Sequence, residues 1–70
     1  MYNEALPFME RGFKINFAIH GEYHPSTASC CEWMSLIYSG LTNQIESQKW
    51  KIRAQNIQNV IGEVGERIAD

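Results

Sequence analysis

Apolar and polar residues alternate clearly over residues 13–20. Every second position there is a large apolar residue: Phe13, Ile15, Phe17 and Ile19. A period of two with aromatic and β-branched residues is typical of a half-buried strand. The sequence therefore predicts a strand over about 13–20. Asn3 and Gly12 are suited to begin and end a short helix before it.

Helical spacing begins after Pro25. Ser26 and Ser29 both suit an N-cap, and Ser29 with Glu32 has the spacing of a capping box. Apolar residues then recur at steps of three or four, at Cys30, Trp33, Met34, Ile37, Leu41 and Ile45. Gly40 interrupts this stripe, and an interior glycine costs about 1 kcal/mol. We therefore expect a helix over about 26–39 that breaks at Ser39–Gly40, with one long helix as the alternative.

The C-terminal segment carries two apolar stripes. One comprises Leu41, Ile45 and Ile52, and the other comprises Trp50, Ala54, Ile57, Ile61, Val64 and Ile68. At about 100° per residue the two stripes lie on nearly opposite sides of a helix. Either the chain breaks near Gln55–Asn59, giving helices over about 42–54 and 56–69, or the two sides meet different partners. A further alternative is a strand over 48–54, where basic and apolar residues alternate.

These elements predict one mainly helical α+β domain over residues 1–70. A lone strand at 13–20 would leave its backbone donors and acceptors without partners. It would have to pair with its copy in a homodimer, with residues 48–54, or with the sheet edge of another protein. Two of these three solutions involve another chain, so we expect a homodimer that also binds another protein.

Composition and length bear on where in the cell the protein is expected to act. The chain has 70 residues, 44% of them hydrophobic, and a formal net charge of −2. No stretch approaches the roughly 20 apolar residues of a membrane span, and residues 1–10 do not read as a secretory signal. Cys30 and Cys31 are adjacent and do not readily reach disulfide geometry. We expect a cytoplasmic protein, of a size that suits a phage or mobile-element accessory protein.

Four potential metal ligands lie within twelve residues: His20, His24, Cys30 and Cys31. Imidazole nitrogens and thiolates bind zinc in a tetrahedron, which makes a small zinc-stabilised module one hypothesis. Adjacent cysteines point about 100° apart on a helix, so at most one would ligate comfortably. The same two thiols lie near a predicted helix N-terminus, which favours a thiolate, so they are the best candidates for a catalytic nucleophile in this sequence. Without a phosphate loop or paired acids, we expect neither catalysis nor a cofactor.

The basic residues suggest a nucleic-acid alternative. Lys49, Lys51 and Arg53 surround Trp50, and such a cluster can contact phosphates and stack a base. In addition, a strand followed by two helices over residues 13–55 resembles the ribbon–helix–helix family. That resemblance implies a DNA-binding dimer in which Lys14, Asn16 and Ala18 read the major groove. The chain departs from the family in its acidic balance and its long strand-to-helix connection.

The function favoured by these patterns is a non-enzymatic regulator that binds another protein. It would act through a strand edge and an apolar helical face with aromatic anchors, because tryptophan and tyrosine are enriched among interface residues that dominate affinity. The candidate partner-binding residues are Trp33, Tyr38, Trp50, Ile57, Ile61, Val64 and Ile68.

Overall fold

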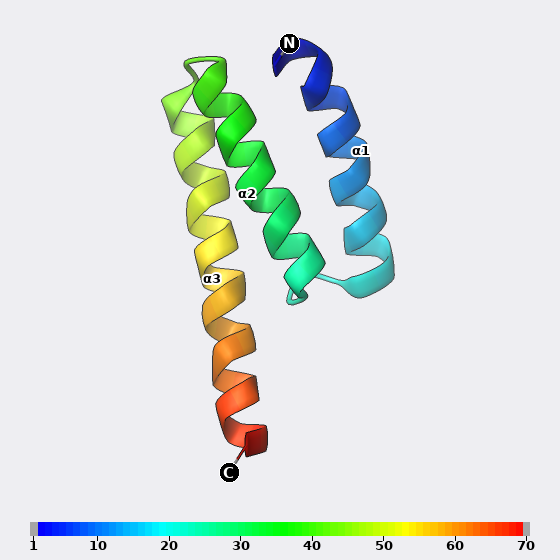
Figure 1. Cartoon of the computed structure of the whole chain (residues 1–70), viewed down its shortest axis with the longest axis vertical. Helices are drawn as coiled ribbons and strands as arrows, with labels where there is room; N and C mark the ends of the chain where they lie inside the picture. Colours follow the sequence, from blue (N-terminus) through cyan, green and yellow to red (C-terminus); the bar gives the residue numbers. More distant parts are fainter. Residues whose placement is uncertain (1, 70) are drawn as a thin grey trace.

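The computed structural model describes residues 2–69, with side chains described through Glu63. The chain forms three helices, α1 (Tyr2–His20), α2 (Pro25–Gly40) and α3 (Gln44–Ala69) (Figure 1). Among the described residues there is no strand, so the predicted α+β fold, with a strand at 13–20 or another at 48–54, is wrong. No helix in this part of the chain is long and apolar enough to cross a membrane.

The residues that predicted a strand form two pairs on α1 instead. Phe13 and Phe17 are four residues apart, as are Ile15 and Ile19, and residues four apart share one side of a helix. The Phe13 and Phe17 ring centroids lie 6.0 Å apart. Phe13 is partly buried, whereas Phe17, Ile15 and Ile19 are exposed. The helix also satisfies the backbone groups that a lone strand would leave unpaired. The alternation therefore reflects two apolar sides of a helix.

The start and end of α1 differ from the expectation for a short helix. The helix runs through Pro7 and Gly12 and stops only at His20. Gly21 has a φ of +80°, a left-handed conformation that favours glycine at a helix end. Its N–H donates to the Phe17 carbonyl at 2.8 Å, which satisfies one of the last carbonyls of the helix.

The start of α2 is capped by a histidine. His24 is the N-cap, its Nδ1 accepts a hydrogen bond from the Ser26 N–H at 3.0 Å, and Pro25 follows in the first turn. Proline suits this place because the first N–H groups of a helix have no partner within it. The cap is therefore neither Ser26 nor Ser29, as the capping-box pattern suggested.

The turn between α2 and α3 confirms the predicted break at Ser39–Gly40. α2 ends at Gly40, and the Leu41 N–H donates to the carbonyls of Ile37 and Tyr38. Asn43 then caps α3, because its Oδ1 accepts from the Glu46 N–H at 3.2 Å. Two well-satisfied helix ends thus make a tight hairpin.

α3 continues without interruption, so the predicted division into helices 42–54 and 56–69 is wrong. The expected break near Gln55–Asn59 is unnecessary because only one of the two apolar stripes is packed. Ile45 and Ile52 of the first stripe are 73% and 52% exposed. The second stripe is packed or partly packed on the core through Trp50, Ala54, Ile57 and Ile61.

The three helices lie side by side in one layer, with α2 in the middle (Figure 1). The layer extends 45 × 23 × 13 Å, so it is much thinner in one direction than in the other two. The α1 and α3 backbones do not contact each other. The last turns of α3 extend past the ends of the other two helices.

Small residues allow α2 and α3 to pack closely. Ala28 and Cys31 of α2 meet Ala54 and Ile57 of α3 in the core cluster. A buried polar link stands beside it, where the Ser47 hydroxyl donates to the Ser35 carbonyl at 2.9 Å. On the other side of α2, the Tyr2 ring covers Gly40 so closely that an added Cβ would lie 2.5 Å from it.

Candidate functional site

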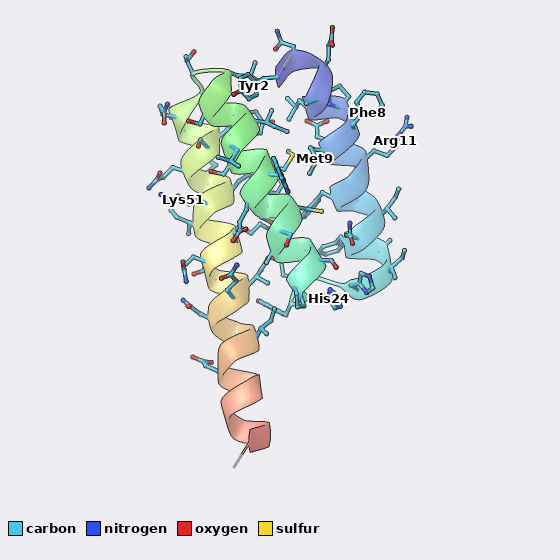
Figure 2. All side chains as sticks on the ribbon, in the orientation of Figure 1. Tyr2, Phe8, Met9, Arg11, His24 and Lys51 are labelled. Atoms are coloured by element: carbon cyan, nitrogen blue, oxygen red, sulfur yellow. The ribbon has the colours of Figure 1, made fainter. Side chains whose placement is uncertain are left out.

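A single layer of helices has two broad sides, and the packing contacts assign residues to each. Asn16 of α1 faces α2, where its Nδ2 donates to Cys30 Sγ at 3.3 Å. In Figure 2, Met9 points toward α2 and Arg11 points away from it. Positions on either side of this contact line therefore belong to opposite sides of the layer.

One side, called the pocket face, is concave and spans all three helices. It holds a pocket of about 280 Å³ lined by Glu10, Phe13, Lys14, Met34, Tyr38, Glu46 and Trp50. Phe13 and Trp50 form its floor together with Met34, and the two rings meet edge to face with centroids 5.1 Å apart. Helix α1 thus reaches α3 across α2 through side chains on this side.

The other side, called the apolar face, is formed by α1 and α2. On the α1 wheel, Phe8, Ile15 and Ile19 lie within about 40° of one another, on the side of Asn16 opposite to Phe13. On α2, Trp33 and Leu36 lie opposite to the pocket-lining residues. Their exposed fractions define the apolar face as a patch open to solvent: Phe8 73%, Ile15 53%, Ile19 70%, Trp33 57% and Leu36 59%.

A polar groove borders the apolar face along α3. This groove of about 430 Å³ lies between α2 and α3 and is lined by Leu36 together with Glu32, Ser35, Ser39, Gln44, Ser47, Gln48 and Lys51. An apolar centre with a polar border is the usual anatomy of a protein–protein interface.

A charged pair closes one end of the pocket face. The Arg53 guanidinium binds both carboxylate oxygens of Glu22, at 2.9 Å through Nε and 2.6 Å through Nη2. It also lies 4.8 Å from the Phe13 ring centroid and 5.4 Å from that of Trp50. The hydrogen bonds to Glu22 raise the pKa of Arg53. The pair joins the α1–α2 loop to α3.

Two carboxylates act on the pocket from the opposite end. Burial first, and then the charges of Glu10 and Glu46, raise the pKa of the Tyr38 hydroxyl. Glu46 also forms an ion pair of 3.3 Å with Lys49, whose side chain is exposed, whereas the Glu46 side chain is partly buried. The pocket therefore combines an aromatic floor with negative charge from two different helices.

The predicted partner-binding residues are distributed over both sides and the core. Trp33 lies on the apolar face, and Tyr38 and Trp50 line the pocket. Ile57 is fully buried and Ile61 packs against the same core, so both contact the chain itself. Val64 and Ile68 lie outside the described side chains.

The residues of the nucleic-acid alternative do not gather on one surface. Lys14 lines the pocket, and Asn16 is turned toward α2. Lys51 lines the polar groove, while Lys49 and Arg53 are paired with carboxylates. The ribbon–helix–helix resemblance depended on a strand at 13–20, and this segment is helical, as is Ala18 within it.

The residues of the zinc hypothesis are brought together only in part. His20 and His24 stack with ring centroids 4.0 Å apart. Within the described residues, no three His, Cys, Asp or Glu side chains form a group that could hold a metal ion. Burial raises the pKa of the Cys31 thiol to about 11, which opposes the thiolate needed for ligation or nucleophilic attack.

Sequence reasoning missed several residues of these surfaces. Ile15 and Ile19 were assigned to the buried side of a strand, and Phe8 and Leu36 were not singled out. Glu10 and Glu46 belong to no sequence motif. They come from distant segments and meet only because both line the same pocket in the folded chain. The spacing of four residues between Ile15 and Ile19 was the signal that could have placed both on one side of a helix.

No protein-family model, curated protein or solved structure matches this chain.

Proposed function

We propose that this protein is a non-enzymatic interaction protein that associates with a second copy of itself through the apolar face. The observation that carries this proposal is the single layer of helices with five exposed large apolar side chains on one broad side. Domains normally consist of two or more packed layers around one core. A second copy placed on the apolar face would supply the missing layer.

The dimensions and charges of the surface support a homodimer. The chain exposes 5108 Å², whereas a compact protein of 8.1 kDa exposes about 4,500 Å². The whole 45 × 23 Å side of the layer, which includes the apolar face, the polar groove and α3, has room for the about 800 Å² that each partner contributes to a standard interface. A net charge of −2 leaves little repulsion between copies.

We propose that the homodimer regulates another protein. The pocket face remains free in such a dimer and could bind that protein. A cytoplasmic location agrees with two free cysteines, one of them fully buried. A small accessory protein, such as phage genomes encode, fits the size of the chain.

The experiment compares two isoleucines of equal exposure. Ile15 is 53% exposed on the apolar face, and Ile52 is 52% exposed on the outer edge of α3. We expect Ile15→Lys to weaken dimerisation at least about tenfold, because a charge in an apolar interface loses its hydration. Ile52→Lys should leave dimerisation unchanged. Sedimentation equilibrium measures both dissociation constants.

Two results would contradict the proposal. One is a wild-type chain that remains monomeric at millimolar concentration. The other is an equal loss of dimerisation in Ile15→Lys and Ile52→Lys, which would place the interface elsewhere. Circular dichroism checks that each variant keeps its helices, as expected for substitutions at half-exposed positions.

A further inference from the structure

The ring pair of Phe13 and Trp50 divides the pocket face into two halves. On one half, Arg53, one turn after Trp50 along α3, lies over both rings and binds Glu22. On the other half, Glu46 lies one turn before Trp50, and Glu10 lies one turn before Phe13 along α1. These two carboxylates border the pocket of about 280 Å³. The same rings thus meet a guanidinium on one side and two carboxylates around an open pocket on the other.

We propose that this pocket binds the arginine side chain of a partner protein. Its floor of Phe13, Met34 and Trp50 suits the aliphatic stem, and a planar guanidinium stacks on aromatic rings while its fork of N–H donors meets carboxylates. Ligand pockets for drug-sized molecules span about 300–1,000 Å³. A smaller, open pocket matches one side chain presented by a larger partner.

The charges around the pocket favour a cation. Glu10 and Glu46 both act on the Tyr38 hydroxyl, so their fields overlap inside the pocket. The pocket lining carries two carboxylates, Glu10 and Glu46, and one ammonium, Lys14, so its net charge is −1. The Lys14 side chain is exposed, and the Lys49–Glu46 pair lies at the surface, where solvent screens it. A guanidinium that contacts both carboxylates and the rings replaces these contacts at little cost.

The position of the pocket separates this inference from the proposed homodimer. The pocket and the apolar face lie on opposite sides of the layer, so a second copy on the apolar face leaves the pocket open. The inference therefore stands or fails independently of self-association.

The experiment uses the full chain and two peptides that differ in one heavy atom and one positive charge. The first is acetyl-Ala-Leu-Arg-Leu-Ala-amide, and the second carries citrulline, an uncharged isostere, in place of arginine. Two-dimensional NMR follows the Trp50 indole N–H, which a Trp33→Phe variant assigns. We expect the arginine peptide to shift this signal and those of Met34 and Tyr38, with at least tenfold higher affinity than the citrulline peptide.

Matched charge variants test the role of the carboxylates. Glu10→Gln/Glu46→Gln should lower the affinity for the arginine peptide at least tenfold and leave the citrulline peptide unaffected. Glu4→Gln/Glu63→Gln changes the net charge equally at exposed positions and should retain binding. All four substitutions are at positions outside the buried core, so the helices should persist in both variants.

Three outcomes would overturn the inference. Equal affinities for the two peptides would show that charge is not recognised. An equal loss in both double variants would indicate a general effect of net charge. A change of subunit number in Glu10→Gln/Glu46→Gln would show that a second copy occupies the pocket. A monomeric wild-type chain that still selects the arginine peptide would refute only the proposed homodimer.

Discussion

The two broad sides of this helical layer differ in how many of their large side chains have packing or hydrogen-bonding partners within the chain. On the pocket face, Phe13 and Trp50 pack against each other and beneath Arg53, which in turn binds Glu22. On the apolar face, Ile15 and the four other large apolar side chains are each more than half exposed. One sequence can therefore complete one side of a layer and leave large apolar side chains exposed on the other.

The largest expected effect compares Met34 with Leu36, two residues apart on α2. Met34 is 1% exposed, and Met34→Ala should lower the free energy of unfolding by about 2–4 kcal/mol because it leaves a cavity. Leu36 is 59% exposed, and Leu36→Ala should cost less than about 0.5 kcal/mol in the monomer. Urea unfolding at low protein concentration measures both. Equal losses would mean that the apolar face is packed within the chain.

A smaller effect concerns the buried thiol of Cys31 at alkaline pH. Its folded-state pKa is about 11, above the ordinary value of 9.0, chiefly because of burial. Below pH 9 the thiol is protonated in both states and does not affect stability. Between pH 9 and 11 only the unfolded state loses the proton, so stability should fall by up to about 2 kcal/mol.

The measurement for Cys31 is the free energy of unfolding across that pH range, under reducing conditions. Cys31→Ala should be less stable at pH 8 but should lose the part of the alkaline decline that this thiol causes. Cys30→Ala is the neighbouring control and should keep the decline. An unchanged slope in Cys31→Ala would contradict the assignment.

The smallest effect concerns the Arg53–Glu22 pair that closes the pocket face. The two side chains are 38% and 27% exposed, so solvent screens their attraction. A double-mutant cycle with Arg53→Met and Glu22→Gln should give a coupling of about 1 kcal/mol, reduced by added salt. A coupling near zero would mean that packing of Arg53 on the rings holds the loop without the ion pair.

The turn between α2 and α3 was the most predictable part of the fold. Gly40 indicated the α2–α3 turn, because glycine is unfavourable inside a helix and suits its end. The two apolar stripes of α3 could also be recognised from the sequence. Their positions on opposite sides of a helix correctly indicated that Ile52 and Ile57 cannot share one core. What sequence could not decide was the conformation of 13–20, where a period of two fits a strand and equally fits two opposite sides of a helix.

The candidate sites were less predictable than the helices. Glu10, Tyr38 and Glu46 lie far apart in the sequence, and only the packing of three helices brings them to one pocket. The sequence singled out Trp50 as a candidate binding residue, and the structure shows that its ring packs against Phe13, a residue that the sequence pattern assigned to a strand. Spacing along a chain reports which residues share an element, and it does not report which elements become neighbours.

Helix α1 carries half of each surface, and this has a thermodynamic consequence. It contributes Phe8, Ile15 and Ile19 to one side of the layer and Glu10 and Phe13 to the other, while only α2 supports its backbone. Local opening of α1 would dismantle both surfaces together. A molecule that bound one surface would therefore suppress that opening and raise the affinity of the other. The two sides would behave as positively linked binding sites, coupled by the docking equilibrium of a single helix.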